Sequence, residues 1–195
     1  MNAQLQQLGT EFRELAERAK TLATRAGERL CERPSPQSWS AGECLEHLRL
    51  STEAYFPVWA RSFTEARALG NWSSGAEYHL DLFGKLLKWT LEPPPKFRFR
   101  APSNFHPIDV GRPDQVLPAF LASQDGLLEF IRQADGLPID KLKVPSPFNS
   151  KLRYSVWSSF CVTAAHQRRH LAQAERAVVT GRSGDSASGF KTAVQ

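Results

Sequence analysis

Four stretches of this chain repeat apolar residues at intervals of three and four, which is the spacing of an amphipathic α-helix. The stretches cover residues 2–31, 41–69, 113–136 and 154–180. Each of them has one apolar side that must be buried against another element. The pattern predicts an all-α fold, a four-helix bundle, because four such helices can bury their apolar sides against one another.

Residues that stop or start helices mark the boundaries of these stretches. The prolines of segment 34–36 end the first helix, because proline cannot donate to the helical hydrogen-bond ladder. Ser40, with Glu43 three positions later, forms a capping-box pattern that begins the second helix. Pro57 lies inside the second stretch, so we expect a kink or a local break near residues 53–57.

The connection between the second and third of these helices is long. Within it, residues 76–91 predict a shorter helix, which the prolines at 93–95 end. We expect residues 96–110 to be irregular or extended. Residues 137–153 hold three prolines and show no clear period, so we expect a loop there. The bundle is therefore predicted to carry an extra short helix in a long crossover connection.

The end of the chain completes the predicted domain organisation. Gly181 is expected to close the last helix, since glycine is common just after a helix C-terminus. Residues 1–181 are predicted to form one bundle domain, which suits a chain of 195 residues. Residues 182–195 are rich in Ser and Gly and are predicted to form a flexible tail.

Charge, cysteine content and hydropathy exclude several classes of function. The net charge of +5 comes from basic residues spread along the chain. A nucleic-acid-binding surface concentrates them on one face, so we expect no nucleic-acid partner. Three cysteines at irregular spacing make no disulfide framework and fit a reducing compartment. We expect no membrane partner and a cytoplasmic location, because no apolar stretch is long enough for a bilayer span or a signal peptide.

His166 and His170 lie one helical turn apart in the last predicted helix. This spacing places two imidazoles on one side of the helix, where both can reach a single cation. His47 falls on the apolar side of the second predicted helix and offers a third imidazole. A tri-histidine site leaves coordination positions open for water or substrate, which is typical of a reactive metal centre. The alternative is that the three are ordinary core or hydrogen-bonded histidines.

Further residues have weaker claims to a role at this site. Glu43 and Gln173 lie about one turn from a candidate ligand and are predicted to orient a ligand histidine by hydrogen bonding. Cys44 ranks lower as a fourth ligand, because free cysteine is usually buried as a small hydrophobe. His79 and His106 are interpreted as surface or substrate-side residues of the crossover. The aromatic residues that either line a substrate entrance or, as is more usual, pack in the core or crossover are Tyr55, Trp72, Tyr78, Trp89, Phe97, Phe99 and Phe105.

Two segments resemble motifs of the DinB-like superfamily of bacterial four-helix-bundle proteins, and the resemblance extends over about residues 5–180. Residues 39–48 are similar to that family's tryptophan, helix start and His-Leu pair. The C-terminal motif consists, in the family's order and spacing, of Pro147-Phe148, Leu152, Trp157 and residues 166–173. Residues 97–107 resemble the family's aromatic- and proline-bearing crossover. Ser146 replaces a common His, and residues 149–150 replace a usual small glycine turn.

The resemblance implies a metal bound by His47, His166 and His170 in a cleft at one end of the bundle, with zinc and nickel as typical ions. Characterised relatives include transferases that use bacillithiol or mycothiol, and a mycothiol-dependent isomerase. The leading hypothesis is therefore a metal-dependent thiol S-transferase with a low-molecular-weight thiol as cosubstrate and a small-molecule substrate. Two alternatives stay open: a metal-dependent hydrolase that activates water, and a non-catalytic metal-binding or stress-associated bundle. A homodimer through an exposed helix face is a further expectation.

Overall fold

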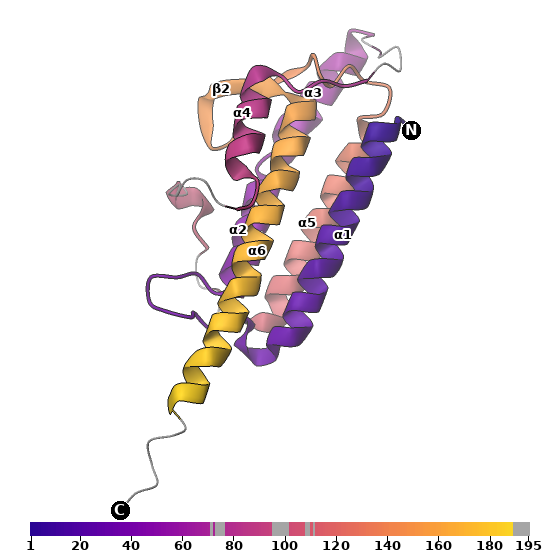
Figure 1. Ribbon diagram of the computed structural model, residues 1–195. Coiled ribbons are helices and arrows are strands. Elements are labelled where there is room, and N and C mark those ends of the chain that lie inside the picture. Colours follow the sequence, from indigo (N-terminus) through magenta and orange to yellow (C-terminus); the bar gives the residue numbers. More distant parts are fainter. Residues whose placement is uncertain (71, 73–76, 95–101, 108–109, 111, 189–195) are drawn as a thin grey trace, which may run out of the picture.

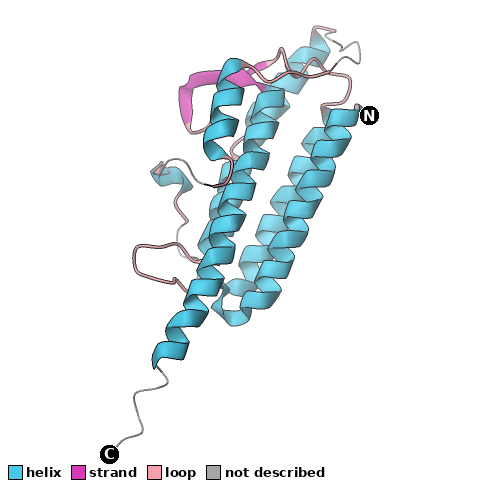
Figure 2. Ribbon diagram, viewed as in Figure 1, coloured by secondary structure: helices cyan, strands magenta, loops and turns pink. Residues whose placement is uncertain are grey.

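The computed structural model describes residues 1–70, 72, 77–94, 102–107, 110 and 112–188. Its elements are α1 (Ala3–Ala26), η1 (Gly27–Cys31), α2 (Ala41–Glu53), α3 (Phe56–Ala68), α4 (Leu82–Leu91), η2 (Ser103–Phe105), α5 (Pro113–Gln133), β1 (Lys143–Ser146), β2 (Asn149–Ser155) and α6 (Val156–Ser188). Helices dominate and the sheet is a small hairpin, so the predicted all-α class is confirmed (Figure 2). Within these residues no helix combines the length and hydrophobicity that a bilayer span requires.

Helices α1, α2, α5 and α6 form the four-helix bundle, and α4 packs on α6 near one end (Figure 1). Ion pairs join Glu11 to Arg168 and Arg18 to Glu175, so α1 and α6 run in the same direction. Ion pairs that are partly or fully exposed add little stability, but they show which turns of the two helices are neighbours.

Helices α2 and α5 also run in the same direction. Val110, just before α5, lies beside Gly42 at the start of α2, and Gly126 of α5 lies against Phe56 beyond the end of α2. Between two parallel neighbours the chain must return along the length of the bundle. The predicted long crossover makes this return, and it carries α4 and η2 with it (Figure 1).

The core contains the apolar sides that the helical spacing predicts. In α1 the buried residues recur at threes and fours, as Leu5, Leu8, Phe12, Leu15, Ala19, Leu22 and Ala26. The largest fully buried side chains are Trp59, Tyr55, Tyr154, Phe12, Phe63, Phe120 and Phe160. Each large apolar side chain that is fully buried contributes about 1.5–3 kcal/mol to folding, so this layer dominates the stability of the bundle.

The start and the break of the second predicted helix are both confirmed. Ser40 Oγ accepts a hydrogen bond from the Glu43 amide at 3.0 Å, and the Glu43 carboxylate accepts one from the Ser40 amide at 2.8 Å. The helix stops at Glu53 and resumes as α3 at Phe56, with Pro57 in the first turn of α3. Proline is tolerated in a first turn, where its missing N–H would have had no helical partner.

The prediction that residues 137–153 form a loop is wrong. Strand β1 pairs antiparallel with β2, and the register shifts between Pro145 and Ser146. A two-stranded hairpin has only edge strands, so it tolerates a proline beside an irregularity. Val144 and Tyr154 face each other in the ladder and are buried against the helices. Strands this short give too few alternations for a period of two to be visible in the sequence.

Two helix boundaries also differ from the prediction. Helix α4 begins at Leu82 rather than at residue 76, because Asp81 accepts a hydrogen bond from the amide of Gly84 and caps the helix there. Helix α6 begins at Val156 and continues through Gly181 to Ser188. Glycine inside a helix costs about 1 kcal/mol relative to alanine, which is too little to end a long helix by itself. The remainder of the predicted flexible tail lies outside the described residues.

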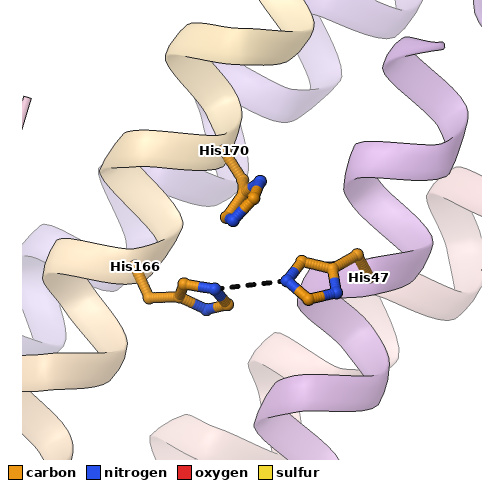
Figure 3. A group of neighbouring side chains, drawn as sticks. All are labelled: His47, His166 and His170. Atoms are coloured by element: carbon orange, nitrogen blue, oxygen red, sulfur yellow. Dashed lines mark hydrogen bonds between the residues drawn. The ribbon is translucent and has the colours of Figure 1, made fainter. Parts of the chain in front are cut away.

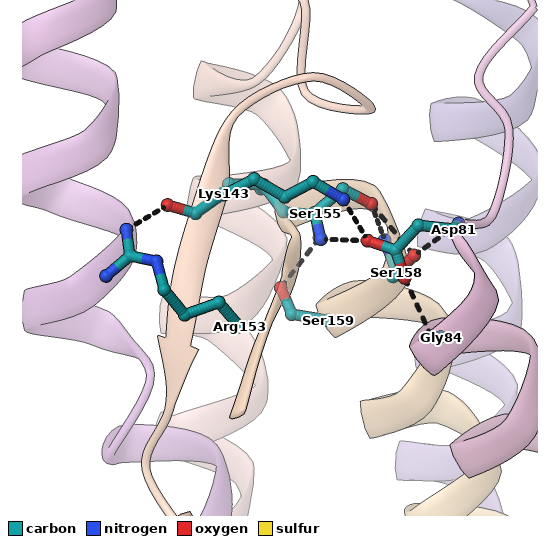
Figure 4. A network of polar contacts seen from close by, with 8 residues as sticks. Asp81, Gly84, Lys143, Arg153, Ser155, Ser158 and Ser159 are labelled. Atoms are coloured by element: carbon teal, nitrogen blue, oxygen red, sulfur yellow. Dashed lines mark hydrogen bonds and ion pairs between the residues drawn. The ribbon is translucent and has the colours of Figure 1, made fainter. Parts of the chain in front are cut away.

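Asp81 joins α4 and the hairpin to α6 (Figure 4). One carboxylate oxygen accepts from the Gly84 amide at 2.8 Å, and the other accepts from the Ser155 amide and from Lys143 Nζ, both at 2.6 Å. The Asp81 amide donates to Ser158 Oγ at 3.1 Å. Gly84 allows this close approach, because a Cβ added there would lie 2.2 Å from Ser158 Oγ. This network therefore fixes one end of the crossover onto the first turn of α6.

A layer of polar side chains crosses the bundle core. Gln167 of α6 donates to Thr52 Oγ1 of α2 at 3.3 Å, and Gln124 of α5 lies on the turn before Gly126. Among the described residues, both amide atoms of Gln124, Oε1 of Gln167 and Ser51 Oγ are buried without a hydrogen-bond partner. A buried polar atom without a partner costs about 1–3 kcal/mol.

Replacing Gln124 with methionine should raise the free energy of unfolding by about 1 kcal/mol or more, because it removes two unpaired polar atoms at nearly constant volume. Gln124 is 1% exposed, so the change in the free energy of unfolding reports on the core and not on the surface. Urea unfolding checks the change, with Gln7→Met on the exposed face of α1 as the matched control. A loss of stability in Gln124→Met alone would show that the amide is satisfied in solution.

Candidate metal centre

The structure brings the three predicted histidines together between α2 and α6 (Figure 3). One nitrogen of each ring lies within 4.8 Å of the corresponding nitrogen of the other two. The Nε2 atoms of His47 and His166 are 3.2 Å apart, and the centroid of the His170 ring is 4.6 Å from those of both other rings. His47 is 2% exposed, while His166 and His170 keep part of their surface accessible. The cluster is therefore less deeply buried at His166 and His170 than at His47.

A backbone carbonyl of the crossover fixes the protonation state of His47. Its Nδ1 lies 2.7 Å from the carbonyl oxygen of Phe105, and a carbonyl can only accept, so Nδ1 must carry the proton. In a neutral imidazole the other nitrogen then bears a lone pair. That nitrogen is Nε2, which faces His166. Holding a ligand histidine by its outer nitrogen is the usual way in which proteins orient a metal ligand.

Burial keeps all three imidazoles neutral. It lowers the pKa of His47, and it lowers the pKa of His166 still further, with positive charge on His170, His47 and Arg169 acting in the same direction. It also lowers the pKa of His170 to about 3, with help from His47 and Arg169, while the side chain of Gln173 opposes the shift. Neutral imidazole is the form that binds metal.

These residues fit a divalent cation. Three neutral imidazoles are a donor set that suits zinc, nickel, copper or iron. Nδ1 of His170 is buried and has no hydrogen-bond partner among the described residues, and the Nε2 atoms of His47 and His166 lie at hydrogen-bond distance, where the lone pair of His47 accepts from His166 in the metal-free protein. Without an ion, this buried nitrogen of His170 stays unsatisfied at a cost of about 1–3 kcal/mol. A cation between the rings would bind the nitrogens that face it and so remove the cost of leaving a buried nitrogen without a partner.

The two residues predicted to orient a ligand have different surroundings. The Glu43 carboxylate binds the guanidinium of Arg33 and the amide of Ser40, and its pKa is lowered because these bonds outweigh the effect of burial. Gln173 lies close enough to His170 to influence its pKa. The roles of Glu43 and Gln173 toward the ligands stay predictions. The acceptor of the His47 proton, the Phe105 carbonyl, has no sequence signal, because every residue has such a group.

Aromatic rings line the cluster. The Trp39 ring centroid lies 5.0 Å from that of His47 and 6.0 Å from that of His170. On another side, Phe148 of the hairpin turn lies 5.9 Å from His166 and 4.5 Å from Phe105. Because the hairpin carries Phe148 and the crossover carries Phe105, both irregular parts of the fold contribute to the walls of the site.

The other candidates are spread over the molecule. His106 lies beside Trp39, with ring centroids 6.0 Å apart, whereas His79 is exposed. Cys44 is fully buried in the core and is not part of the histidine cluster found among the described residues. Tyr55 and Tyr78 are buried, Trp72 and Trp89 are exposed, and Phe97 and Phe99 lie outside the described residues. Of the aromatic candidates that are described, Phe105 lines the cluster.

Acid should destabilise the metal-free protein. The pKa values of His47, His166 and His170 are lowered in the folded state, so the unfolded chain binds more protons below its ordinary histidine pKa of about 6.5. Their contribution to stability is present above that pH and is lost as the pH falls below it. The free energy of unfolding should drop by up to about 1.4 kcal/mol per pH unit for each histidine.

Urea unfolding in the presence of a chelator, between about pH 7 and pH 5, measures this dependence before most carboxylates titrate. His170→Ala should make the slope smaller, and the exposed His79→Ala should leave it unchanged. A free energy of unfolding that is constant over this range in the unmodified chain would contradict the buried, neutral state of the cluster.

The comparison with protein families agrees with this geometry. The family model described as the DinB superfamily matches residues 4–174, a range that includes both helices of the cluster and all three histidines. Searches of curated proteins and of solved structures each gave no match. The matched range takes in nearly the whole bundle, from α1 to the second half of α6. The chain therefore belongs to the DinB superfamily.

Proposed function

We propose that this protein is a metal-dependent enzyme in which His47, His166 and His170 hold a divalent ion, zinc or nickel, and an open coordination position accepts a thiol. The observation that carries the proposal is the cluster itself: three imidazole nitrogens within 4.8 Å of one another, with one ring buried and two partly accessible. Such an ion lowers the pKa of a bound thiol or water and so supplies a nucleophile near neutral pH.

The protein's own groups have separate tasks in this proposal. The Phe105 carbonyl holds His47 in the tautomer that presents Nε2 to the ion. The accessible edges of His166 and His170 leave one side free for the thiol and the second substrate. Trp39 and Phe148 exclude water from the remaining sides and offer apolar surface to a small-molecule electrophile. The reaction class that follows is attack of the thiolate on that electrophile: a carbon–sulfur bond forms, the leaving group of the electrophile departs as an anion, and the thiol proton goes to solvent.

Thiol consumption tests the proposal directly. The untagged protein, loaded with zinc or nickel, should accelerate the reaction of bacillithiol, mycothiol or cysteine with 1-chloro-2,4-dinitrobenzene. His166→Ala should lose at least about 100-fold of that rate, because losing a ligand exceeds the 10–100-fold effect of losing a ligand's support. His79→Ala is the control, since it removes an exposed histidine outside the cluster.

The outcome also separates the competing functions. Metal binding with no thiol turnover, but with metal-dependent hydrolysis of a nitrophenyl ester, would favour the hydrolase. Metal binding with neither activity would favour a non-catalytic module. If the untagged protein binds no metal, the transferase, the hydrolase and the metal-binding module all lose their basis.

We further propose a small-molecule substrate, a cytoplasmic location, no nucleic-acid or membrane partner, and a homodimer. The exposed apolar residues of α4, Leu82, Phe83 and Leu86, provide a helix face of the kind that the dimer requires. Light scattering of the purified protein measures the oligomeric state. A monomer at all accessible concentrations would contradict the dimer and leave the proposed chemistry intact.

A further inference from the structure

Three buried hydroxyl groups meet where the hairpin packs on the bundle. Tyr55 lies between α2 and α3, Tyr154 lies in β2, and Ser146 is the last residue of β1. The two phenol oxygens are 2.5 Å apart, and the Ser146 hydroxyl is hydrogen-bonded to both phenols. All three side chains are buried. Burial raises the pKa of both tyrosines, so the three groups are neutral hydroxyls.

These three groups satisfy one another and also reach the hairpin turn. A hydroxyl donates one hydrogen bond and accepts up to two, so three hydroxyls in mutual contact can form a closed ring in which each donates once and accepts once. We call this group of Tyr55, Tyr154 and Ser146 the hydroxyl ring. The Ser146 oxygen keeps one further acceptor position, and the Phe148 amide donates to it at 3.3 Å. The hydroxyl ring therefore connects the junction of α2 and α3 to the turn that carries Phe148.

The turn needs an anchor of this kind. Residues 149–151, which follow Phe148, are exposed, whereas Phe148 itself is partly buried and packs against the core. The register of the ladder shifts between Pro145 and Ser146, directly before the turn. Such an irregularity interrupts the regular pairing of the two strands. The hydroxyl ring holds the chain at the point where the backbone pairing is interrupted.

Phe148 in turn contacts groups that hold two of the three candidate ligands. Its ring centroid lies 5.9 Å from that of His166 and 4.5 Å from that of Phe105. The carbonyl of Phe105 accepts the hydrogen bond from Nδ1 of His47. A Phe148 ring that moved away would therefore leave the His166 ring and the segment that orients His47 less restrained.

We propose that Tyr55, Tyr154 and Ser146 are positioning residues for the metal centre and that they act through Phe148. The inference rests on the proposed function, because it concerns the same metal site. Ligands that are held in place before the ion arrives bind it more tightly than mobile ligands, because less conformational entropy is lost on binding. The hydroxyl ring would supply this restraint without touching the ion or a substrate.

The test measures the Kd of the untagged protein for zinc and for nickel, by competition with a chromophoric chelator. Tyr154→Phe removes one hydroxyl and keeps the aromatic ring. It should weaken metal binding about tenfold, the lower end of the 10–100-fold range for groups that support a ligand, because it acts through an additional contact. Ser146→Ala should weaken metal binding by a similar factor, since it removes the acceptor of the Phe148 amide together with one member of the hydroxyl ring.

Tyr78→Phe is the matched control. It also removes a buried tyrosine hydroxyl, one that donates to the carbonyl oxygen of Leu137 at 3.1 Å. The Tyr78 ring packs on Trp157 in the first turn of α6, about two and a half turns before His166. This substitution should change the Kd by less than about twofold, within the error of additivity for distant sites.

A double-mutant cycle shows whether the hydroxyl ring acts through Phe148. Phe148→Ala should itself weaken metal binding, and the addition of Tyr154→Phe should then weaken it by less than about a further twofold. A general loss of stability would weaken binding equally with and without Phe148. A tenfold effect of Tyr154→Phe that persists in the Phe148→Ala protein would therefore overturn the inference.

The inference and the proposed function fail differently. If the unmodified protein binds zinc or nickel, and Tyr154→Phe and Ser146→Ala bind it with the same Kd, the positioning role is wrong and the metal centre is unaffected. If the unmodified protein binds neither metal, the proposed function is wrong, and the positioning role is wrong with it.

Discussion

Replacing His166 with alanine should leave a folded protein that no longer retains a metal ion. The three rings meet at one point, with the Nε2 atoms of His47 and His166 3.2 Å apart, so loss of one ring leaves two ligands from different helices. We expect the affinity for zinc or nickel to fall at least about 100-fold, more than when only the support of a ligand is removed. Equilibrium dialysis followed by elemental analysis measures the bound metal per chain.

The fold itself should survive this substitution. Because His166 is partly exposed, its replacement by alanine leaves a space that solvent can reach rather than a sealed cavity. The substitution also leaves no unpaired charge in the core, since the imidazole is neutral. The unmodified protein should gain about 4 kcal/mol of stability at a metal concentration 1,000 times its Kd, and His166→Ala should gain about 1.4 kcal/mol or less at that concentration, because its affinity is at least about 100-fold weaker.

His79→Ala is the matched control, because it also removes one histidine but from an exposed position. All samples must lack a histidine tag, since such a tag binds nickel by itself. Retention of one ion per chain by His166→Ala, with the same affinity as the unmodified protein, would show that the ion binds elsewhere and would remove the basis of the proposed function.

The helices could be predicted from the sequence because each buries a stripe with a strong local period. The seven buried apolar side chains of α1 recur at threes and fours, and Pro57 marks the break between α2 and α3. The hairpin could not be predicted in this way. Its strands owe their form to contacts with distant elements, such as the hydrogen bond from the Ser155 amide to Asp81. Such long-range pairing leaves no period in a segment of four to seven residues.

The candidate site also has a part that the sequence predicts and a part that only the structure reveals. The spacing of His166 and His170 places two rings on one face of a helix, which is a local property that the sequence contains. The meeting of His47 with that pair depends on the packing of α2 against α6, and the structure supplies it. The carbonyl that holds His47 comes from Phe105 in the crossover. Any residue type provides a carbonyl, so nothing in the sequence distinguishes this one.

The crossover explains why so much of the site lies in irregular segments. Since α2 and α5 are parallel, the chain must travel back along the bundle, and its path passes beside the buried His47 of α2. The return segment can therefore serve two purposes, connecting the helices and closing the site. Changes in this segment would alter the walls of the site without disturbing the packing of the bundle.

Replacing Trp59 with alanine should lower the free energy of unfolding by about 3–5 kcal/mol, a large part of the 5–15 kcal/mol that is typical of a domain. Trp59 is 0% exposed. Its ring stacks on Tyr55 at 5.0 Å between centroids and contacts Phe160 at 4.6 Å, and its Nε1 donates to Ser159 Oγ at 2.8 Å. The substitution removes these contacts, leaves a cavity and deprives the buried Ser159 hydroxyl of a partner.

Urea unfolding of the metal-free protein measures this loss without a contribution from metal binding. Trp72→Ala, at a 65% exposed tryptophan, should change the free energy by less than about 1 kcal/mol. Trp59→Phe should fall between the two, because phenylalanine keeps most of the stacking with Tyr55 but cannot donate to Ser159. If Trp59→Ala cost no more than Trp72→Ala, the junction of α3 with α6 would not be the packed core that the structure shows.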